Sequence, residues 1–377
     1  MNKMMQKQTR RTQIRASIQT GVTLIELLIA MVLSLVVVAA ASGVYLATSS
    51  AFTSVDSSSQ LQDSARFATY ILRRTVQQIG YEDYTASSAG YSRSSELVAS
   101  AALPTCVQSD ICGFNNRAMT VDDVIANSPG TTGTLTGGFY SDTLIARFQG
   151  QGAQVLSPTT RTRSPPSTTV GDGSMIDCGG NSVASNDEAS RTSRAMSALY
   201  VGVNSVTGEP ELYCSSLSYA SSAAGAGRPP VPLVKGVEVF KVMYEVGNDT
   251  ADSSGVSDGG LDVYRWVRAD QVAGLALTNA SERADGTKRV NDAVNAWRNV
   301  VSVRFGLVIR GDIGSAPLPA TAQTLFPLGA EFAVTGDPAT TYVPPIDTRL
   351  RRVVTFTINI RNTQNAFFTT PKPATSP

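Results

Sequence analysis

A single glutamate inside a long apolar run limits what this chain can fold into. The run follows Gly21 directly, beginning Val22-Thr23-Leu24-Ile25-Glu26, and from Leu27 to Leu46 almost every residue is aliphatic or small. About 20 such residues at ~1.5 Å each span a bilayer core of about 30 Å. A carboxylate in a membrane-spanning helix costs roughly 2.5–3.5 kcal/mol at the helix centre, so Glu26 is predicted to have a functional partner.

The segment before this helix predicts its orientation. Residues 1–21 contain five cations and no acid; the cations are Lys3, Lys7, Arg10, Arg11 and Arg15. Basic flanks stay on the cytoplasmic side of a membrane helix. We therefore expect one helix across the membrane and everything after Thr48 outside the cytoplasm.

Two simpler interpretations of this region remain open. A secretory signal peptide could be cleaved at the small residues Ala39-Ala40-Ala41, although the apolar stretch exceeds the usual ~7–15 residues. A plain single-pass anchor with an incidental Glu26 is the other. A lipoprotein is excluded because no cysteine lies near the N-terminus.

The string G-V-T-L-I-E before an apolar run resembles the class III signal of type IV pilins and type II secretion pseudopilins. In that family a prepilin peptidase cuts after the glycine, here Gly21, and methylates the new amino terminus, here Val22. The resemblance implies that Glu26 faces the Val22 ammonium of a neighbouring subunit. A buried carboxylate persists when an opposite charge lies within a few Å, and cleavage creates that charge.

A second helical pattern follows the apolar run. Apolar residues recur at steps of three and four at Leu61, Ala65, Ala68, Leu72, Val76 and Ile79, which predicts one buried helix face. Gly80-Tyr81 is typical of a helix end. A continuous helix from Val22 to Ile79 would be about 87 Å long.

Residues after about 85 are predicted to form β-strands joined by long loops. Alternation over 301–310 and 354–361 predicts two strands, each with one buried face. Shorter strands are expected at 143–148, 199–203, 211–214 and 237–246, and a short helix at 288–297 with Thr287 as its N-cap.

Several head segments resemble the PilW-type minor pilins, which are related to the J-type minor pseudopilins: Leu61–Tyr81, Cys178-Gly179, Leu212-Tyr213-Cys214, Pro232–Tyr244 and Trp297–Arg310. The resemblance implies an α+β, type IV pilin-like fold with a long helical spine packed on a β-rich globular head. The expected organisation is a leader over 1–21, a helix over 22–80 (transmembrane over 22–47, amphipathic over 48–80) and a periplasmic β-rich head over 81–377.

The charge balance argues against a nucleic-acid-binding surface over the whole protein. Removing the five leader cations from 31 Lys and Arg leaves 26 against 30 Asp and Glu. Small basic clusters remain at Arg265/Arg268, Lys288/Arg289 and Arg349/Arg351/Arg352. We expect solvated basic edges there, so direct nucleic-acid binding is not expected; DNA contact during uptake is the alternative.

The four cysteines all follow the membrane segment, and an even count in an exported domain predicts two disulfides. Proximity favours Cys106–Cys112, which leaves Cys178–Cys214, among the three possible pairings. A zinc site is the alternative, but the chain has no histidine and no C-x-x-C spacing.

The composition also argues against an enzyme. Without histidine, the chain lacks the usual base of Ser-His-Asp and Cys-His sites, and it has no phosphate-binding glycine loop. The loop bearing Asp249, Asp252, Asp258 and Asp262 lacks EF-hand spacing. A solvated loop is expected there, with a calcium site as the alternative, and no cofactor is expected.

The resemblance, together with these patterns, implies a structural minor pilin that primes, assembles or caps a type IV pilus after cleavage between Gly21 and Val22. Its expected partners are the prepilin peptidase, the major pilin, other minor pilins, the inner membrane and the assembly platform. It should lie in the inner membrane with a periplasmic head before assembly, and in the pilus at the cell surface afterwards. The alternatives are a J-type minor pseudopilin of a type II secretion system and a membrane-anchored periplasmic binding protein.

Overall fold

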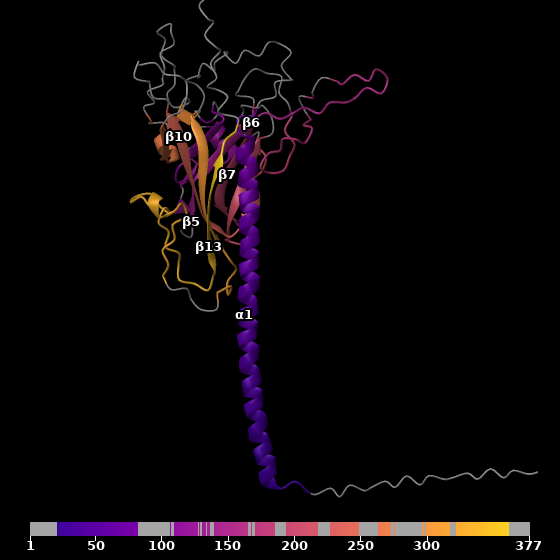
Figure 1. Cartoon of the computed structure of the whole chain (residues 1–377), viewed down its shortest axis with the longest axis vertical. Helices are drawn as coiled ribbons and strands as arrows, with labels where there is room; N and C mark the ends of the chain where they lie inside the picture. Colours follow the sequence, from indigo (N-terminus) through magenta and orange to yellow (C-terminus); the bar gives the residue numbers. More distant parts are fainter. Residues whose placement is uncertain are drawn as a thin grey trace, which may run out of the picture. The chain divides into compact units, whose positions relative to one another are not determined.

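The computed structural model divides the chain into two compact units, Met1–Thr53 and Ser54–Pro377, each considered by itself. It describes residues 21–81, 106, 109–126, 128, 130–132, 134–135, 139–164, 167, 170–184, 194–217, 227–248, 263–272, 275, 296–297, 299–316 and 322–361. The described part contains one long helix, α1, and a β-rich region, some of whose strands are labelled in Figure 1.

Helix α1 extends over Leu24–Gln78, 55 residues without a break. Its last third carries the predicted stripe: Leu61 and Ala65 are almost fully buried, and Ala68, Leu72 and Val76 are fully buried, as is Ile79 directly after the helix. Each fully buried Leu or Val side chain contributes about 1.5–3 kcal/mol. The helix ends because Gly80 adopts a φ of 71° and its N–H donates to the Arg147 carbonyl at 2.9 Å, outside the helix.

The first sheet has five antiparallel strands in the order β1-β6-β7-β8-β9. Their bounds are β1 Ile111–Phe114, β6 Thr143–Phe148, β7 Ala195–Val203, β8 Pro210–Leu217 and β9 Val231–Lys235. Every residue of β6 is buried, which agrees with its place inside the sheet, between β1 and β7. The predicted strand at 143–148 is confirmed, and β7 and β8 extend the shorter predictions at 199–203 and 211–214.

The second sheet has the order β13-β12-β10-β5-β4, and β11 pairs with the C-terminal part of β10. The bounds are β13 Arg351–Asn359, β12 Val300–Arg310, β10 Val237–Asn248, β11 Val263–Val267, β5 Phe139–Ser141 and β4 Thr134–Leu135. The pairing of β10 with β5 is parallel, and the other pairings are antiparallel.

Short elements complete the described part. Helix α3, Val121–Ile125, begins with a capping box in which Thr120 and Asp123 satisfy each other's backbone N–H groups. Strands β2, Arg117–Ala118, and β3, Thr131–Thr132, form a two-stranded ribbon. Helix α4 covers Ala269–Val272 and the 3-10 helix η2 covers Ala330–Phe332.

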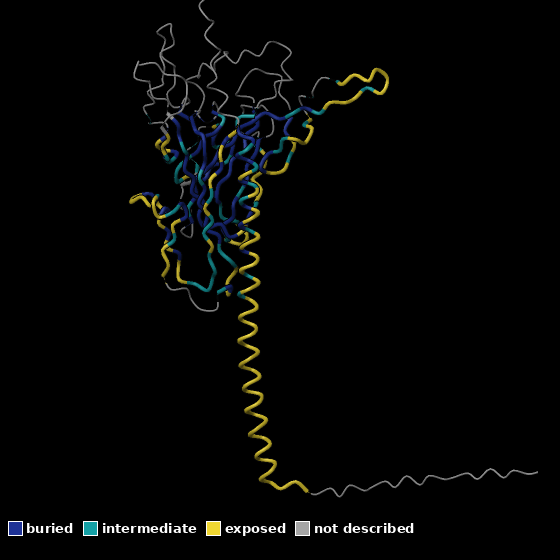
Figure 2. Tube along the Cα trace, in the orientation of Figure 1, coloured by how far each residue is buried: buried dark blue, intermediate teal, exposed yellow. Residues whose placement is uncertain are grey.

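The two sheets share one main core with the buried face of α1. Figure 2 shows this core as the dark blue interior of the β-rich region. A single residue, Asp142, separates β5 of the second sheet from β6 of the first. The chain therefore passes from one sheet to the other at one buried carboxylate, which is 2% exposed.

The expectation of one buried face is wrong for β12. Nearly all of its residues are buried, because residues 325–342 cover the second face, where Val308 packs with Val239, Ala339 and Tyr342. Gly306 permits this cover: a Cβ there would lie 2.5 Å from the Pro327 carbonyl carbon. Strand β13 begins at Arg351, three residues before the predicted alternation.

Two predicted features lie wholly or largely outside the described residues. The helix expected at 288–297 is described only at Ala296 and Trp297, which are helical. The acidic loop carrying Asp249, Asp252, Asp258 and Asp262 lies outside them entirely.

Candidate functional site

The start of α1 carries the predicted leader-cleavage and assembly residues. Gly21, Val22 and Thr23 precede the helix, and Glu26 lies in its first turn. The Glu26 N–H donates to the Thr23 carbonyl at 3.1 Å, with the Thr23 hydroxyl oxygen at 3.4 Å. The free N–H groups at a helix start favour a carboxylate by roughly 0.3–1 kcal/mol at an exposed position. Glu26 is therefore placed where the helix itself tolerates an acid best.

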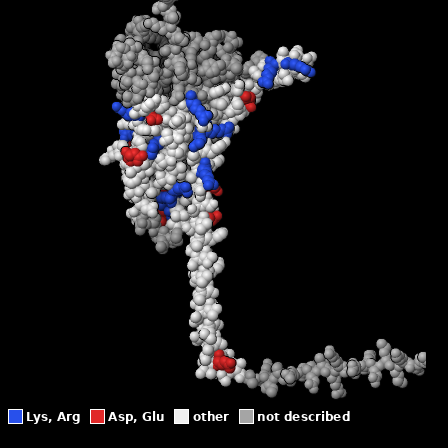
Figure 3. Space-filling view, in the orientation of Figure 1, with Lys and Arg blue, Asp and Glu red and all other residues white. Residues whose placement is uncertain are grey.

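The rest of this segment is apolar on all sides. Figure 3 shows the first part of α1 as almost entirely uncharged, and Glu26 is the only charged residue between Val22 and Thr53. The aliphatic side chains here are exposed all round the helix. By length and composition α1 is suited to cross a membrane. A helix that is apolar all round needs lipid or other helices around it.

Several hydroxyl groups in this segment are satisfied within the helix. Ser42 and Thr48 donate to the carbonyls of Val38 and Val44 at 2.8 Å, four residues earlier, and Ser34 donates to Met31 at 2.8 Å. A membrane interior offers no water to such groups, so internal hydrogen bonds lower the free-energy cost of placing them in lipid. The charge of Glu26 has no opposite charge within this segment, so its partner has to come from outside the segment.

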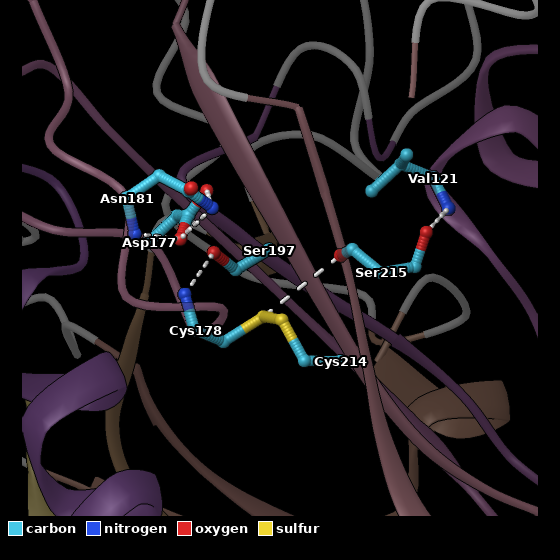
Figure 4. Close-up of a disulfide and its surroundings, with 7 residues drawn as sticks. All are labelled: Val121, Asp177, Cys178, Asn181, Ser197, Cys214 and Ser215. Carbon is cyan, nitrogen blue, oxygen red and sulfur yellow. Dashed lines mark hydrogen bonds between the residues drawn. A yellow bond between two sulfur atoms is a disulfide. The ribbon is translucent and has the colours of Figure 1, made fainter. Parts of the chain in front are cut away.

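Two disulfides stabilise the β-rich unit. They join Cys106 to Cys112 and Cys178 to Cys214, the two pairs that the sequence favoured. Cys214 lies in the middle of β8, whereas Cys178 belongs to the irregular stretch between β6 and β7. The Cys178 N–H also donates to the Ser197 hydroxyl of β7 at 3.2 Å (Figure 4).

The turn that presents Cys178 is itself closed by hydrogen bonds. The Asp177 carboxylate accepts from the Asn181 backbone at 2.8 Å and from its side-chain amide at 3.0 and 3.1 Å (Figure 4). Beside the disulfide, the Ser215 hydroxyl accepts from the Val121 N–H at 3.1 Å. The second disulfide thus fixes an irregular segment to β8, an inner strand of the first sheet.

A buried ion-pair network lies where β10, β12 and β13 run together. Glu238 is fully buried and pairs with Arg310 at 3.1 Å and Arg351 at 2.8 Å. Glu209 pairs with Arg310 at 2.8 Å and with Arg349 at 2.9 Å. Burial acts to raise the pKa of Glu209, but hydrogen bonds from the two arginines lower it below its usual value.

This network corrects part of the basic-cluster prediction. Arg349 and Arg351 are not a solvated edge, because their side chains are 10% and 3% exposed and both are ion-paired. Arg268 pairs with Asp270 at 3.0 Å. Lys288 and Arg289 lie outside the described residues.

A second buried cluster surrounds Lys241 of β10, whose Nζ lies 2.8 Å from Asp142 and 3.0 Å from Asp337. Reasoning from the sequence missed both clusters. Their signal was present, since Glu238 and Lys241 interrupt an otherwise apolar strand in V-E-V-F-K-V-M-Y. Within the described ranges, no group of three or more Cys, Asp or Glu residues is arranged to hold a metal ion.

Parts of this chain match known protein families. A family model described as type IV pilus-assembly protein W matches residues 198–362, and one described as the prokaryotic N-terminal methylation motif matches residues 17–42. A solved type IV-like pilin from Thermus thermophilus is similar with a TM-score of 0.34 and 13% identity, covering 81% of this chain and 98% of that chain. None of the curated proteins matches.

Proposed function

This chain is a PilW-type minor pilin of the type IV pilin family, and we propose that it primes assembly of a pilus or occupies its tip. Its role is structural, as it is for the families that it matches. The observation that carries the proposal is the lone carboxylate Glu26, five residues after Gly21, in a helix that is otherwise apolar.

The leader is cleaved between Gly21 and Val22, and the new amino group of Val22 is methylated. Before cleavage the Val22 nitrogen belongs to a peptide bond and carries no charge. Afterwards it is a cation within the first turns of the helix, able to pair with Glu26 of a neighbouring subunit. Opposite charges within a few Å offset the cost of holding a carboxylate in lipid. Processing therefore switches on assembly.

A tip or priming position suits the size of the head. About 356 residues remain after cleavage at Gly21, and most of them lie beyond α1. A head of that size would crowd its neighbours in a thin fibre if every subunit carried one, whereas a terminal position leaves it room. Before assembly the protein waits in the inner membrane with its head in the periplasm, and its partners are the peptidase, the assembly platform and the other pilins.

Mass spectrometry of the mature N-terminus tests the processing step. The expected result is a chain that begins at a methylated Val22. An intact leader, or a start near Ser42, would contradict the proposal and favour a plain anchor or a secretory signal.

Substitution of Glu26 tests the assembly step. Glu26→Ala should insert into the membrane at least as well as the wild type, because a costly charge is removed, yet it should be absent from sheared fibres. Ser34→Ala is a matched control in the same helix, since its hydroxyl bonds only within the helix in the described structure. Incorporation of Glu26→Ala at the wild-type level would remove the role assigned to the carboxylate.

The second candidate is a J-type minor pseudopilin, which would use the same helix and the same carboxylate in a secretion machine. Deletion of the gene separates the two functions. Loss of surface pili with normal protein secretion supports the pilus, and loss of secretion with normal pili supports the pseudopilin.

A further inference from the structure

Lys241 is a lysine buried in the middle of β10, with its side chain 1% exposed. Its Nζ lies 2.8 Å from Asp142 Oδ1 and 3.0 Å from Asp337 Oδ1. Two amide oxygens complete the surroundings: Asn115 Oδ1 at 3.0 Å and Asn116 Oδ1 at 3.1 Å. One amine therefore contacts two carboxylates and two carboxamides in a site from which bulk water is largely excluded.

Asn116 is held in place from three directions. It lies in the turn between β1 and β2 with a φ of 52°, a left-handed conformation that few residues other than glycine adopt. Its backbone N–H donates to Asp142 Oδ1 at 2.8 Å, and its side-chain Nδ2 donates to Asp337 Oδ1 at 2.9 Å. Its amide oxygen faces the amine of Lys241.

Asp337 Oδ1 consequently contacts both nitrogens: the Lys241 amine at 3.0 Å and the Asn116 amide nitrogen at 2.9 Å. An amine that replaces the nitrogen of an amide has to lose a proton, and the departing nitrogen has to gain one. A carboxylate in contact with both atoms can carry that proton, which is the geometry that general acid–base catalysis requires.

Burial acts on the charged groups of this cluster. Removing charges from water penalises both an ammonium and a carboxylate. The same effect is visible at the neighbouring carboxyl, where burial raises the pKa of Asp142 although Lys241 acts in the opposite direction.

We propose that Lys241 and Asn116 join through an intramolecular amide bond. Lys241 gives a proton to Asp337 and attacks Cγ of Asn116, which is one bond from the oxygen it already touches. The Nζ–Cγ bond forms and the Cγ–Nδ2 bond breaks. Of the three hydrogens on the lysine ammonium, one stays on the new amide and two pass through Asp337 to Nδ2. Ammonium leaves, Asp337 ends as the carboxylate it was, and no oxidant or cofactor is consumed.

The ammonium would leave through the pocket beside Asp337. A pocket of about 400 Å³ is lined by Val334, Gly336, Asp337 and Pro338, among others. The bond would tie β10 to the turn after β1, across 125 residues of chain. Unlike the two disulfides, it would survive a reducing agent.

Peptide mapping by mass spectrometry tests this bond in the full chain, purified in detergent and reduced. The expected result is a branched peptide that contains both Asn116 and Lys241 and is lighter than the two separate peptides by one ammonia. Trypsin should also fail to cut after Lys241. Two linear peptides of unmodified mass from the wild-type protein would overturn the proposal, whatever any variant does.

Two variants test the assigned roles. Asp337→Asn keeps the shape of the side chain but cannot carry the proton, so the branched peptide should be lost completely. Asn115→Ala removes the other amide oxygen near Lys241 and should leave the branched peptide in place. A branched peptide at the wild-type level in Asp337→Asn would overturn the role of Asp337, and a bond to Asn115 in place of Asn116 would overturn the choice of partner.

Discussion

At the scale of single residues, the head depends on charges inside its sheets. Glu238 is completely buried, and both of its oxygens are used by Arg310 and Arg351. A buried ion pair need not add stability over an apolar replacement, but removal of one partner leaves the other charge uncompensated. Glu238 is therefore needed because it neutralises the charges of Arg310 and Arg351.

We expect Glu238→Ala to lower the free energy of unfolding by about 3–5 kcal/mol. Urea unfolding followed by tryptophan fluorescence measures this, because Trp297 is buried edge-on against Tyr244. Lys235→Ala is the matched control: its pair with Asp312 is exposed, so the loss should be about 1 kcal/mol or less. Equal losses in the two variants would contradict this account of the network.

At the scale of elements, α1 and the inner strand β6 could be predicted closely from the sequence. The reason is physical: a stripe such as Leu72 and Val76 repeats at the helical period, and β6 is a short apolar run bounded by polar residues. Strand β12 was predicted with the wrong burial, because residues 325–342, distant in sequence, cover its second face. Local periodicity carries no information on such a contact.

Only part of the candidate site could likewise be predicted from the sequence. Gly21, Val22 and Glu26 could be named from the sequence because their pattern is local and contiguous. Lys241 contacts Asp337 and Asp142, which are 96 and 99 residues away in the chain. Glu238 contacts Arg310 and Arg351, which are 72 and 113 residues away. Only the folded chain brings those groups together.

The buried stripe of α1 can be tested by truncation. Leu72→Ala should lower the free energy of unfolding by about 2–5 kcal/mol, because it opens a cavity in the core. Phe67→Ala, on the exposed face of the same helix, should change it by less than about 1 kcal/mol. A loss in Phe67→Ala as large as that in Leu72→Ala would show that the core lies on the other face.

The disulfide between Cys178 and Cys214 should also stabilise the head. It closes a segment of 36 residues, so replacing both cysteines with serine should cost about 2–5 kcal/mol. Non-reducing gels give a direct check, since reduction of the wild type should slow its migration. No change in mobility, together with four reactive thiols, would contradict both disulfides.

At the scale of the whole molecule, the stability of the head should depend on pH through its paired carboxylates. Hydrogen bonds from Arg351 hold the pKa of Asp347 below its ordinary value. A carboxyl group whose pKa is lower in the folded state stabilises it above the unfolded pKa, near 4, and loses that contribution as the pH falls through the folded pKa.

We therefore expect the urea midpoint of the wild type to fall as the pH drops below about 4. In Asp347→Asn the decline should be shallower, because the carboxyl group whose pKa is lowered in the folded state is gone and no longer takes up a proton. The difference between the two proteins isolates Asp347 from the other acids. Parallel curves would mean that its pairing with Arg351 contributes nothing to folding.

The passage from β5 to β6 through Asp142 has a consequence for the order in which the sheets form during synthesis. Asp142 emerges early, yet Lys241, which neutralises it, follows 99 residues later in the chain. At a synthesis rate of about 5–20 residues per second, that interval lasts about 5–20 s. For those seconds β5 lacks its parallel neighbour β10, and the apolar strand beside it has no finished second sheet to cover it. Folding of this chain should therefore depend on chaperones that shield its first half until the second arrives.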